Sequence, residues 1–157
     1  MTASVTVSAS DPGLRVALHD GFVVDTDRSR LDHTTVHEWL STDAFWALGR
    51  SFEAVSRAAD ASINFGVYNT EGDQVGYARV FTDGVTFGWL CDVYIARPFR
   101  GCGLGTALSS VIVEMVRPLG LNRFMLSTVD AHELYSQVGF IPFPDPQKLM
   151  MLGTKKA

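Results

Sequence analysis

Residues 100–106 form a glycine-rich segment whose composition is typical of an anion-binding turn. Glycine has no Cβ and tolerates positive φ angles, so backbone N–H groups can approach an anion closely. An apolar helical pattern starts at Leu104, and a helix N-terminus presents free N–H groups and a positive dipole end. The flanking guanidinium and hydroxyl can add further contacts. The segment reads Arg100, Gly101, Cys102, Gly103, Leu104, Gly105 and Thr106.

Two other phosphate-binding patterns fit this segment less well. A P-loop requires a lysine after its last glycine, and a dinucleotide fingerprint requires different glycine spacing and an acidic residue after the next parallel strand. The spacing therefore predicts a phosphate loop of another kind. A glycine-rich strand-to-helix turn without a ligand is the alternative.

Three strand-like runs precede the loop, at Ile63–Tyr68, Gln74–Thr82 and residues 85–95. The turns between them are short and predict an antiparallel meander. In the third run alternate apolar side chains predict one buried face, made by Val85, Phe87, Trp89, Cys91, Val93 and Ile95. The helix that follows the loop is expected to end at Pro118 and Gly120.

The remaining elements predict a mixed sheet of about six to seven strands flanked by about four helices, an α/β (α+β) fold. We expect one domain over residues 14–157, after a flexible lead-in over residues 1–13 that ends at a turn signal. Residues 41–43 offer N-cap chemistry for a helix that continues to about residue 61, with a break at Gly49. Further strands are expected at 21–26, 123–127, 140–143 and 149–152, and further helices at 33–40 and 131–138.

Composition excludes several classes of function. The chain has 157 residues, 46% hydrophobic and 19% charged, and these values predict a folded domain. A net charge of −4 argues against a nucleic-acid partner. No apolar run reaches the ~20 residues of a membrane span. Cys91 and Cys102 fit free thiols in the cytoplasm, and their spacing to histidines predicts no metal site.

Two segments together resemble the GCN5-related N-acetyltransferase (GNAT) family. Its acetyl-coenzyme A signature, Gln/Arg-x-x-Gly-x-Gly/Ala, is matched by Arg100, Gly103 and Gly105. Its last signature is a short helix ending in Leu-Tyr, then a turn and Gly-Phe, which residues 131–140 match. The resemblance covers residues 63–143. More narrowly, residues 41–50 and 130–132 are similar to bacterial members of the small-molecule type.

This resemblance implies the GNAT fold, acetyl-CoA as co-substrate and no metal. It also implies coenzyme contacts at the end of the strand before the loop, in the loop itself and after the next strand. Many members carry asparagine at the last position, where this chain has threonine, so the pantetheine contact there stays open. The implied contacts are Val93, Tyr94, Ile95, Arg100, Gly101, Cys102, Gly103, Leu104, Gly105, Thr106 and Thr128.

The chemistry requires two proton transfers. An alkylamine with a pKa near ~10.4 is mostly protonated at neutral pH, and deprotonating it costs about 4–5 kcal/mol. The departing thiolate gains from a proton donor, and Tyr135 matches the family's general acid. Packing is the alternative role for this side chain. Asp92 interrupts an apolar strand, and we expect it to orient the amine, to act through water as a base with a raised pKa, or to be a structural carboxylate that caps nearby backbone N–H groups. His132 is expected to assist Tyr135 or to be structural.

The resemblance assigns the acceptor pocket to the first two helices and the strands that face them. Candidates to line it are Phe45, Trp46, Arg50, Arg79 and Phe81, with core packing and surface ion pairs as the alternatives. Aromatic walls suit a small-molecule amine. Acetylation of a protein lysine or N-terminus, and a non-catalytic acyl-CoA sensor, are the other functions that the sequence allows. The family also allows a homodimer.

Overall fold

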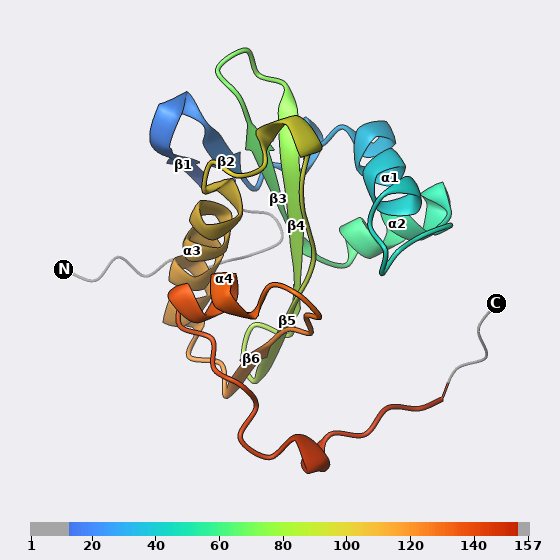
Figure 1. Ribbon diagram of the computed structural model, residues 1–157, viewed down its shortest axis with the longest axis vertical. Helices are drawn as coiled ribbons and strands as arrows, with labels where there is room; N and C mark the ends of the chain where they lie inside the picture. The colour runs from blue at the N-terminus through green and yellow to red at the C-terminus, as the bar shows by residue number, and fades with distance from the viewer. Residues whose placement is uncertain (1–12, 154–157) are drawn as a thin grey trace.

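A computed structural model describes residues 13–153 as a six-stranded sheet with helices on both faces (Figure 1). The strands follow one another across the sheet in chain order, and every neighbouring pair is antiparallel except β5 and β6. The predicted meander is therefore confirmed. The strands are β1 (Arg15–Ala17), β2 (Val23–Asp25), β3 (Ile63–Tyr68), β4 (Gln74–Thr82), β5 (Phe87–Ile95) and β6 (Arg123–Met125).

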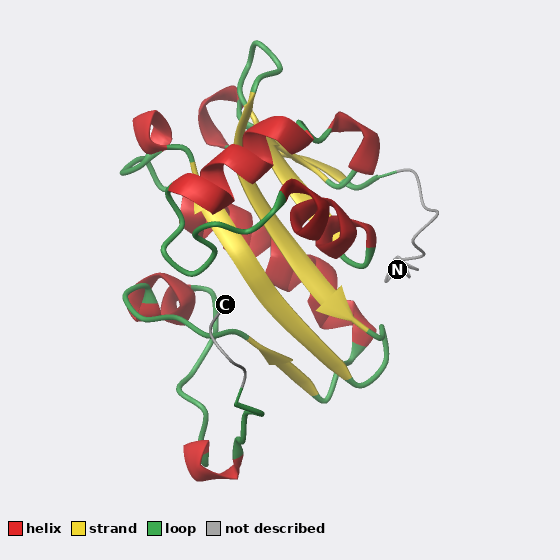
Figure 2. Cartoon of the chain, turned by 90° about the vertical axis from the view of Figure 1, so that its right-hand side faces the viewer, coloured by secondary structure: helices red, strands yellow, loops and turns green. Residues whose placement is uncertain are grey.

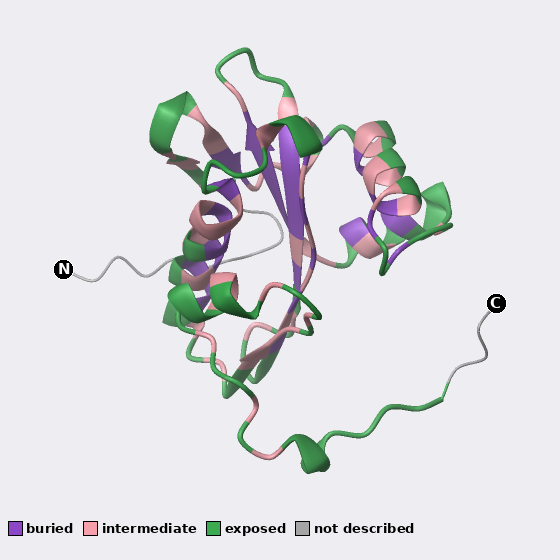
Figure 3. Cartoon of the chain, viewed as in Figure 1, coloured by how far each residue is buried: buried purple, intermediate pink, exposed green. Residues whose placement is uncertain are grey.

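Two helical layers enclose the sheet. α3 (Leu104–Val116) and α4 (His132–Gln137) lie on one face, while α1 (His33–Thr42) and α2 (Phe52–Asp60) lie on the other (Figures 1 and 2). Each layer buries its own apolar cluster against the sheet, as the purple ribbon in Figure 3 shows. Short 3₁₀ turns occur at His19–Gly21, Arg28–Arg30, Arg97–Phe99, Arg117–Leu119 and Pro146–Lys148.

β5 carries a bulge at its centre that changes which side chains face each layer. Cys91 pairs with Arg79 and Tyr94 pairs with Tyr77, so two residues of β5 oppose one residue of β4. Asp92 has a φ of 53°, in the left-handed region that an aspartate tolerates better than most residues. The bulge places Leu90 in the cluster under α3 and Tyr94 in the cluster under α1 and α2.

The prediction that alternate residues of 85–95 share one buried face was therefore wrong. Gly88, Leu90, Asp92 and Tyr94 are the buried positions, and Val85 and Phe87 are exposed. The buried positions do alternate, but they are the other residues of the strand. They also do not share one face, because the extra residue of the bulge reverses the direction of the later side chains, so Leu90 and Tyr94 pack in different clusters.

β5 and β6 are paired over only three residue pairs, from Phe87 with Arg123 to Trp89 with Met125. Beyond these pairs no ladder joins the two segments, although β5 continues to Ile95. The opening between them lies at the carboxyl end of the parallel pair, where α/β sheets commonly bind ligands.

Two other predictions of local structure were wrong. Residues 41–43 end α1 instead of capping a new helix, and α2 begins at Phe52 with Ser51 as its N-cap. Gly49, with a φ of 77°, lies in the irregular segment between the helices, which agrees with the expected break. Residues 140–143 and 149–152 contain no strand, and most of this C-terminal stretch is exposed (Figure 3).

Within residues 13–153 no helix is long and apolar enough to cross a membrane. Nearly all of the expected lead-in lies outside the described residues, as does most of its turn signal.

Candidate active site

A cavity of about 290 Å³ lies where β5 separates from the chain that follows β6. One wall is β5 around its bulge, a second is the segment that leads into α4, and the α1–α2 connection closes a third side. The lining residues are Phe45, Trp46, Trp89, Leu90, Cys91, Asp92, Val93, Leu126, Ser127, Thr128, Val129, Asp130, Ala131 and Tyr135.

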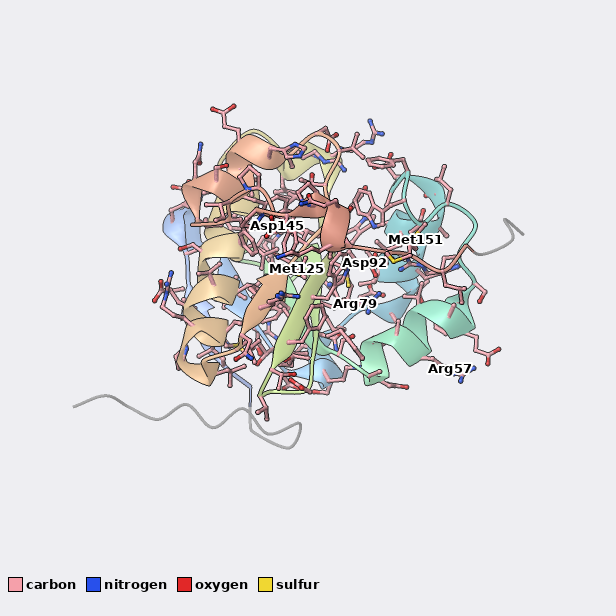
Figure 4. All side chains as sticks on the ribbon, turned by 90° about the horizontal axis from the view of Figure 1, so that it is seen from below. Arg57, Arg79, Asp92, Met125, Asp145 and Met151 are labelled. Atoms are coloured by element: carbon pink, nitrogen blue, oxygen red, sulfur yellow. The ribbon has the colours of Figure 1, made fainter. Side chains whose placement is uncertain are left out.

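The carboxylate of Asp92 joins three elements at the base of this cavity. Its Oδ2 accepts hydrogen bonds of 2.7 Å from Arg50 and from Arg79, and its Oδ1 accepts one of 3.0 Å from the Trp46 indole. The Asp92 side chain is 2% exposed. Figure 4 shows Asp92 and Arg79 side by side at the centre of the molecule. The α1–α2 connection, β4 and the β5 bulge are thereby held together.

The expectation that Asp92 has a raised pKa was wrong. Burial alone would raise its pKa, but hydrogen bonds and charge from Arg79 and Arg50 outweigh burial and hold the pKa below its ordinary value. A carboxylate with a lowered pKa binds a proton weakly and is therefore a weak base. The structural alternative, an aspartate satisfied by neighbouring donors, describes the geometry.

The five residues predicted to line an acceptor pocket fall into two groups. Phe45 and Trp46 do line the cavity, from an irregular connection instead of the predicted helix. Arg50 and Arg79 direct their guanidinium groups to Asp92 and are not among the lining residues, and neither is Phe81. The arginines therefore match the ion-pair alternative.

Tyr135 reaches the cavity from α4. Its ring packs edge-on against Phe140 with 5.9 Å between centroids, and it joins the rim of the apolar cluster under α3. Burial, with a smaller effect from the Asp130 carboxylate, raises the pKa of Tyr135. The hydroxyl therefore stays protonated throughout the neutral range, as a proton donor must. His132 lies on the exposed side of the same helix and does not line the cavity.

The glycine-rich loop has the backbone geometry that its composition predicts. Gly101 and Gly103 have φ angles of 81° and 84°, and Gly103 is the N-cap of α3. A Cβ at Gly101 would meet nothing within 4 Å, so the loop is open to solvent. The first backbone N–H groups of α3 have no partner inside the helix. The loop therefore fits a phosphate group.

An aspartate that the sequence analysis considered only as a helix cap holds the arginine of the loop. Asp43 pairs with Arg97 and with Arg100, and it accepts a 2.6 Å hydrogen bond from the Tyr94 hydroxyl. The hydrogen bonds from Arg97 and Tyr94 hold the pKa of Asp43 well below its ordinary value. Arg100 also donates to the Ile95 carbonyl. The interpretation of Asp43 as a cap used only local sequence, whereas these partners lie more than 50 residues away.

The other predicted coenzyme contacts are distributed around the same strand and cavity. Val93 and Thr128 line the cavity, and the Thr128 hydroxyl accepts a 3.0 Å hydrogen bond from the Ala131 N–H, which orders the approach to α4. Cys102 donates to the Phe99 carbonyl within the loop. Cys91 also lines the cavity, and burial raises the pKa of its thiol to about 11, so it is a poor nucleophile.

No group of three metal-binding side chains occurs in the described part of the chain.

The sequence pattern of the acetyltransferase (GNAT) family matches residues 33–140. A Gibberella zeae protein assigned to the acetyltransferases is 33% identical over 135 residues, in an alignment that covers 74% of this chain and 76% of the fungal protein. A Xanthomonas campestris crystal structure assigned to the same family is 40% identical, has a TM-score of 0.78, and covers 88% of this chain and 96% of its own.

A more distant structure has ligands in place. Neisseria gonorrhoeae N-acetylglutamate synthase, complexed with coenzyme A and N-acetylglutamate, has a TM-score of 0.61 at 16% identity. The match covers 75% of this chain and 28% of the synthase, and at this identity it supports the fold alone.

The role of the Asp92 network predicts a large loss of stability in Asp92→Asn. Asparagine tolerates the left-handed backbone but leaves two partly buried arginines without a counter-charge, so we expect the free energy of unfolding to fall by about 3 kcal/mol at pH 7. Because the folded pKa is lowered, the stabilisation is present above the ordinary value of 3.8 and is lost as pH falls through the folded pKa. Urea titrations at pH 7 and pH 3 measure both effects.

Asp60→Asn is the matched control, because Asp60 forms one exposed ion pair, of 2.7 Å, with Arg28. We expect it to lose less than about 1 kcal/mol. Equal losses in the two variants would contradict a structural role for Asp92.

The open loop predicts that Gly103→Asp abolishes coenzyme binding. A carboxylate at this helix N-terminus would face the phosphates, and juxtaposed like charges cost several kcal/mol, so we expect affinity for coenzyme A to fall at least about 100-fold in calorimetry. Gly120→Asp is the control, since Gly120 also has a positive φ, of 64°, and open space, but lies beyond the other end of α3. If both variants bind coenzyme A normally, the loop is not the phosphate site.

Proposed function

Because the chain belongs to the acetyltransferase (GNAT) family, we propose that it transfers the acetyl group of acetyl-CoA to the primary amine of a small molecule. The observation that supports this proposal most directly is that one strand, β5, leads from the cavity to the glycine-rich loop. β5 lines the cavity at its bulge and ends at Ile95, and the phosphate loop begins at Arg100. A donor anchored at the loop can therefore extend along β5 into a cavity that contains a protonated tyrosine.

The loop binds the phosphates of the coenzyme. Its glycines expose backbone N–H groups, α3 contributes its positive end, and Arg100 and Arg97 add two cations, of which Asp43 neutralises about one. The surplus charge and the open backbone suit a polyanion better than a neutral ligand.

The bulge positions backbone groups for the reacting carbonyl. Asp92 and Val93 together oppose Ala78, so part of their backbone lies outside the β4 ladder, and both residues line the cavity. We propose that these backbone groups of Asp92 and Val93 orient the carbonyl oxygen of the thioester, which becomes more negative during attack. The Asp92 network fixes the bulge and is a positioning device for this step.

In the proposed reaction the amine displaces the thiol of coenzyme A directly, and this step requires no oxidant and no metal. The amine, after losing one proton to solvent, forms a bond from its nitrogen to the thioester carbon, and the carbon–sulfur bond breaks. Tyr135 donates a proton to the leaving sulfur, the nitrogen releases its second proton to solvent, and solvent returns a proton to Tyr135. The products are an amide and a free thiol. A cavity of about 290 Å³ is at the lower end of ligand sites, which suits a small acceptor.

A role for Tyr135 as proton donor predicts that Tyr135→Phe slows turnover while coenzyme binding is retained. Loss of a general acid costs about 100-fold or more, so we expect thiol release to fall by that factor with the best acceptor of a panel of polyamines, arylalkylamines, amino acids and peptides. Calorimetry with coenzyme A should give an unchanged affinity.

Tyr68→Phe provides the control, because the Tyr68 hydroxyl is buried on β3 without a partner in the described structure. It should turn over at the normal rate. Normal turnover by Tyr135→Phe would remove the assigned role.

A further inference from the structure

We propose that the acceptor is a cationic amine with an aromatic body and no anionic group, as in arylalkylamines. This inference rests on the proposed function and defines the acceptor class of the same cavity.

The aromatic part of the argument comes from the α1–α2 connection and β5. Phe45 and Trp46 pack edge-on with 5.1 Å between centroids, yet they remain 55% and 45% exposed on the cavity wall. Trp89 adds a third aromatic side chain, from β5. Large aromatic faces left open in a cavity favour a flat apolar ligand, which removes them from water by stacking or edge contact.

The charge part of the argument comes from the composition of the lining. Among the described residues that line the cavity there is no lysine, arginine or histidine, whereas there are two aspartates. The carboxylate of Asp92 is already paired with Arg50 and with Arg79, so it is not available to a ligand. Asp130 is exposed and forms no ion pair within the described residues.

Asp130 also lies close to the reacting region. Its carboxylate is near enough to contribute to the raised pKa of Tyr135, and it lines the cavity just before α4. A protonated amine would be attracted here, next to the group that protonates the leaving thiolate. The carboxylate of an amino acid, or the phosphate of an amino sugar, would lose water without gaining a counter-charge.

Arg50 and Arg79 are the two cations of the Asp92 network, and Asp92 lines the cavity. Their side chains are 26% and 18% exposed, and each donates to Asp92 at 2.7 Å. Using either arginine to bind an anionic acceptor would remove a partner from a buried carboxylate. The network therefore opposes recognition of an anion as well as stabilising the fold.

Pairs of acceptors that differ only by a carboxylate test the charge part. We expect thiol release from acetyl-CoA with tryptamine and phenethylamine to exceed that with tryptophan and phenylalanine by at least about 100-fold in kcat/KM. Spermidine, which has no aromatic body, should also be a poor acceptor. A lysine peptide should be poor as well, because it is too large for the cavity. Faster turnover of an amino acid, of spermidine or of the peptide would overturn the proposed class.

A charge reversal tests the assignment to Asp130. Asp130→Lys places a cation where the amine should bind, so the preference for tryptamine over tryptophan should shrink about tenfold or more. Glu133→Lys makes the same charge change on the exposed side of α4, outside the lining, and should leave the preference unchanged. Equal preferences in the two variants would overturn the role of Asp130.

The same assay separates failure of this inference from failure of the proposed function. If thiol is released only with an acceptor of another class, the proposed acetyl transfer stands and the proposal of an arylalkylamine acceptor fails. No thiol release with any acceptor, despite calorimetric binding of coenzyme A, rejects the proposed function itself and with it this inference.

Discussion

The buried carboxylate of Asp92 is the contact on which the arrangement of the site depends. A charge in this position would be very costly alone, and two guanidinium groups and an indole N–H compensate for its lost water. The partners come from β4 and the α1–α2 connection, 13 to 46 residues away in the chain. A single side chain therefore fixes the β5 bulge and the wall that faces it.

A second carboxylate repeats this arrangement at the coenzyme end of the same strand. Asp43 links the end of α1 to Tyr94 and to the arginines before and within the phosphate loop. The α1–α2 connection is consequently tied to β5 at both of its ends, through Asp43 and through Arg50. A displacement of the α1–α2 connection would therefore break contacts with β5 at the bulge and near the loop, so these two parts of the site are mechanically connected.

The parts of this structure that local sequence determines were predictable. Glycine at positive φ, the apolar period of α3 and short polar turns depend on neighbours within a few residues, and the loop, the helix and the meander were predicted from them. The bulge at Asp92 and the role of Asp43 depend on partners far away in the chain, so periodicity and capping rules failed there. Residues 140–143 and 149–152 have strand-like composition, but in the described structure no neighbouring strand pairs with them.

The distribution of charge along β5 separates the two ligands that the site must distinguish. At the loop, two arginines share one aspartate and leave a positive surplus, which suits phosphates. At the bulge, two arginines also share one aspartate, but their guanidinium groups point to Asp92 and are not part of the cavity lining. Asp130 is the charged side chain that lines the cavity without an ion pair among the described residues. In the reaction that we propose, the anionic coenzyme and the cationic amine are therefore attracted to opposite ends of one strand. Their reacting atoms would meet where that strand bulges, next to the protonated Tyr135.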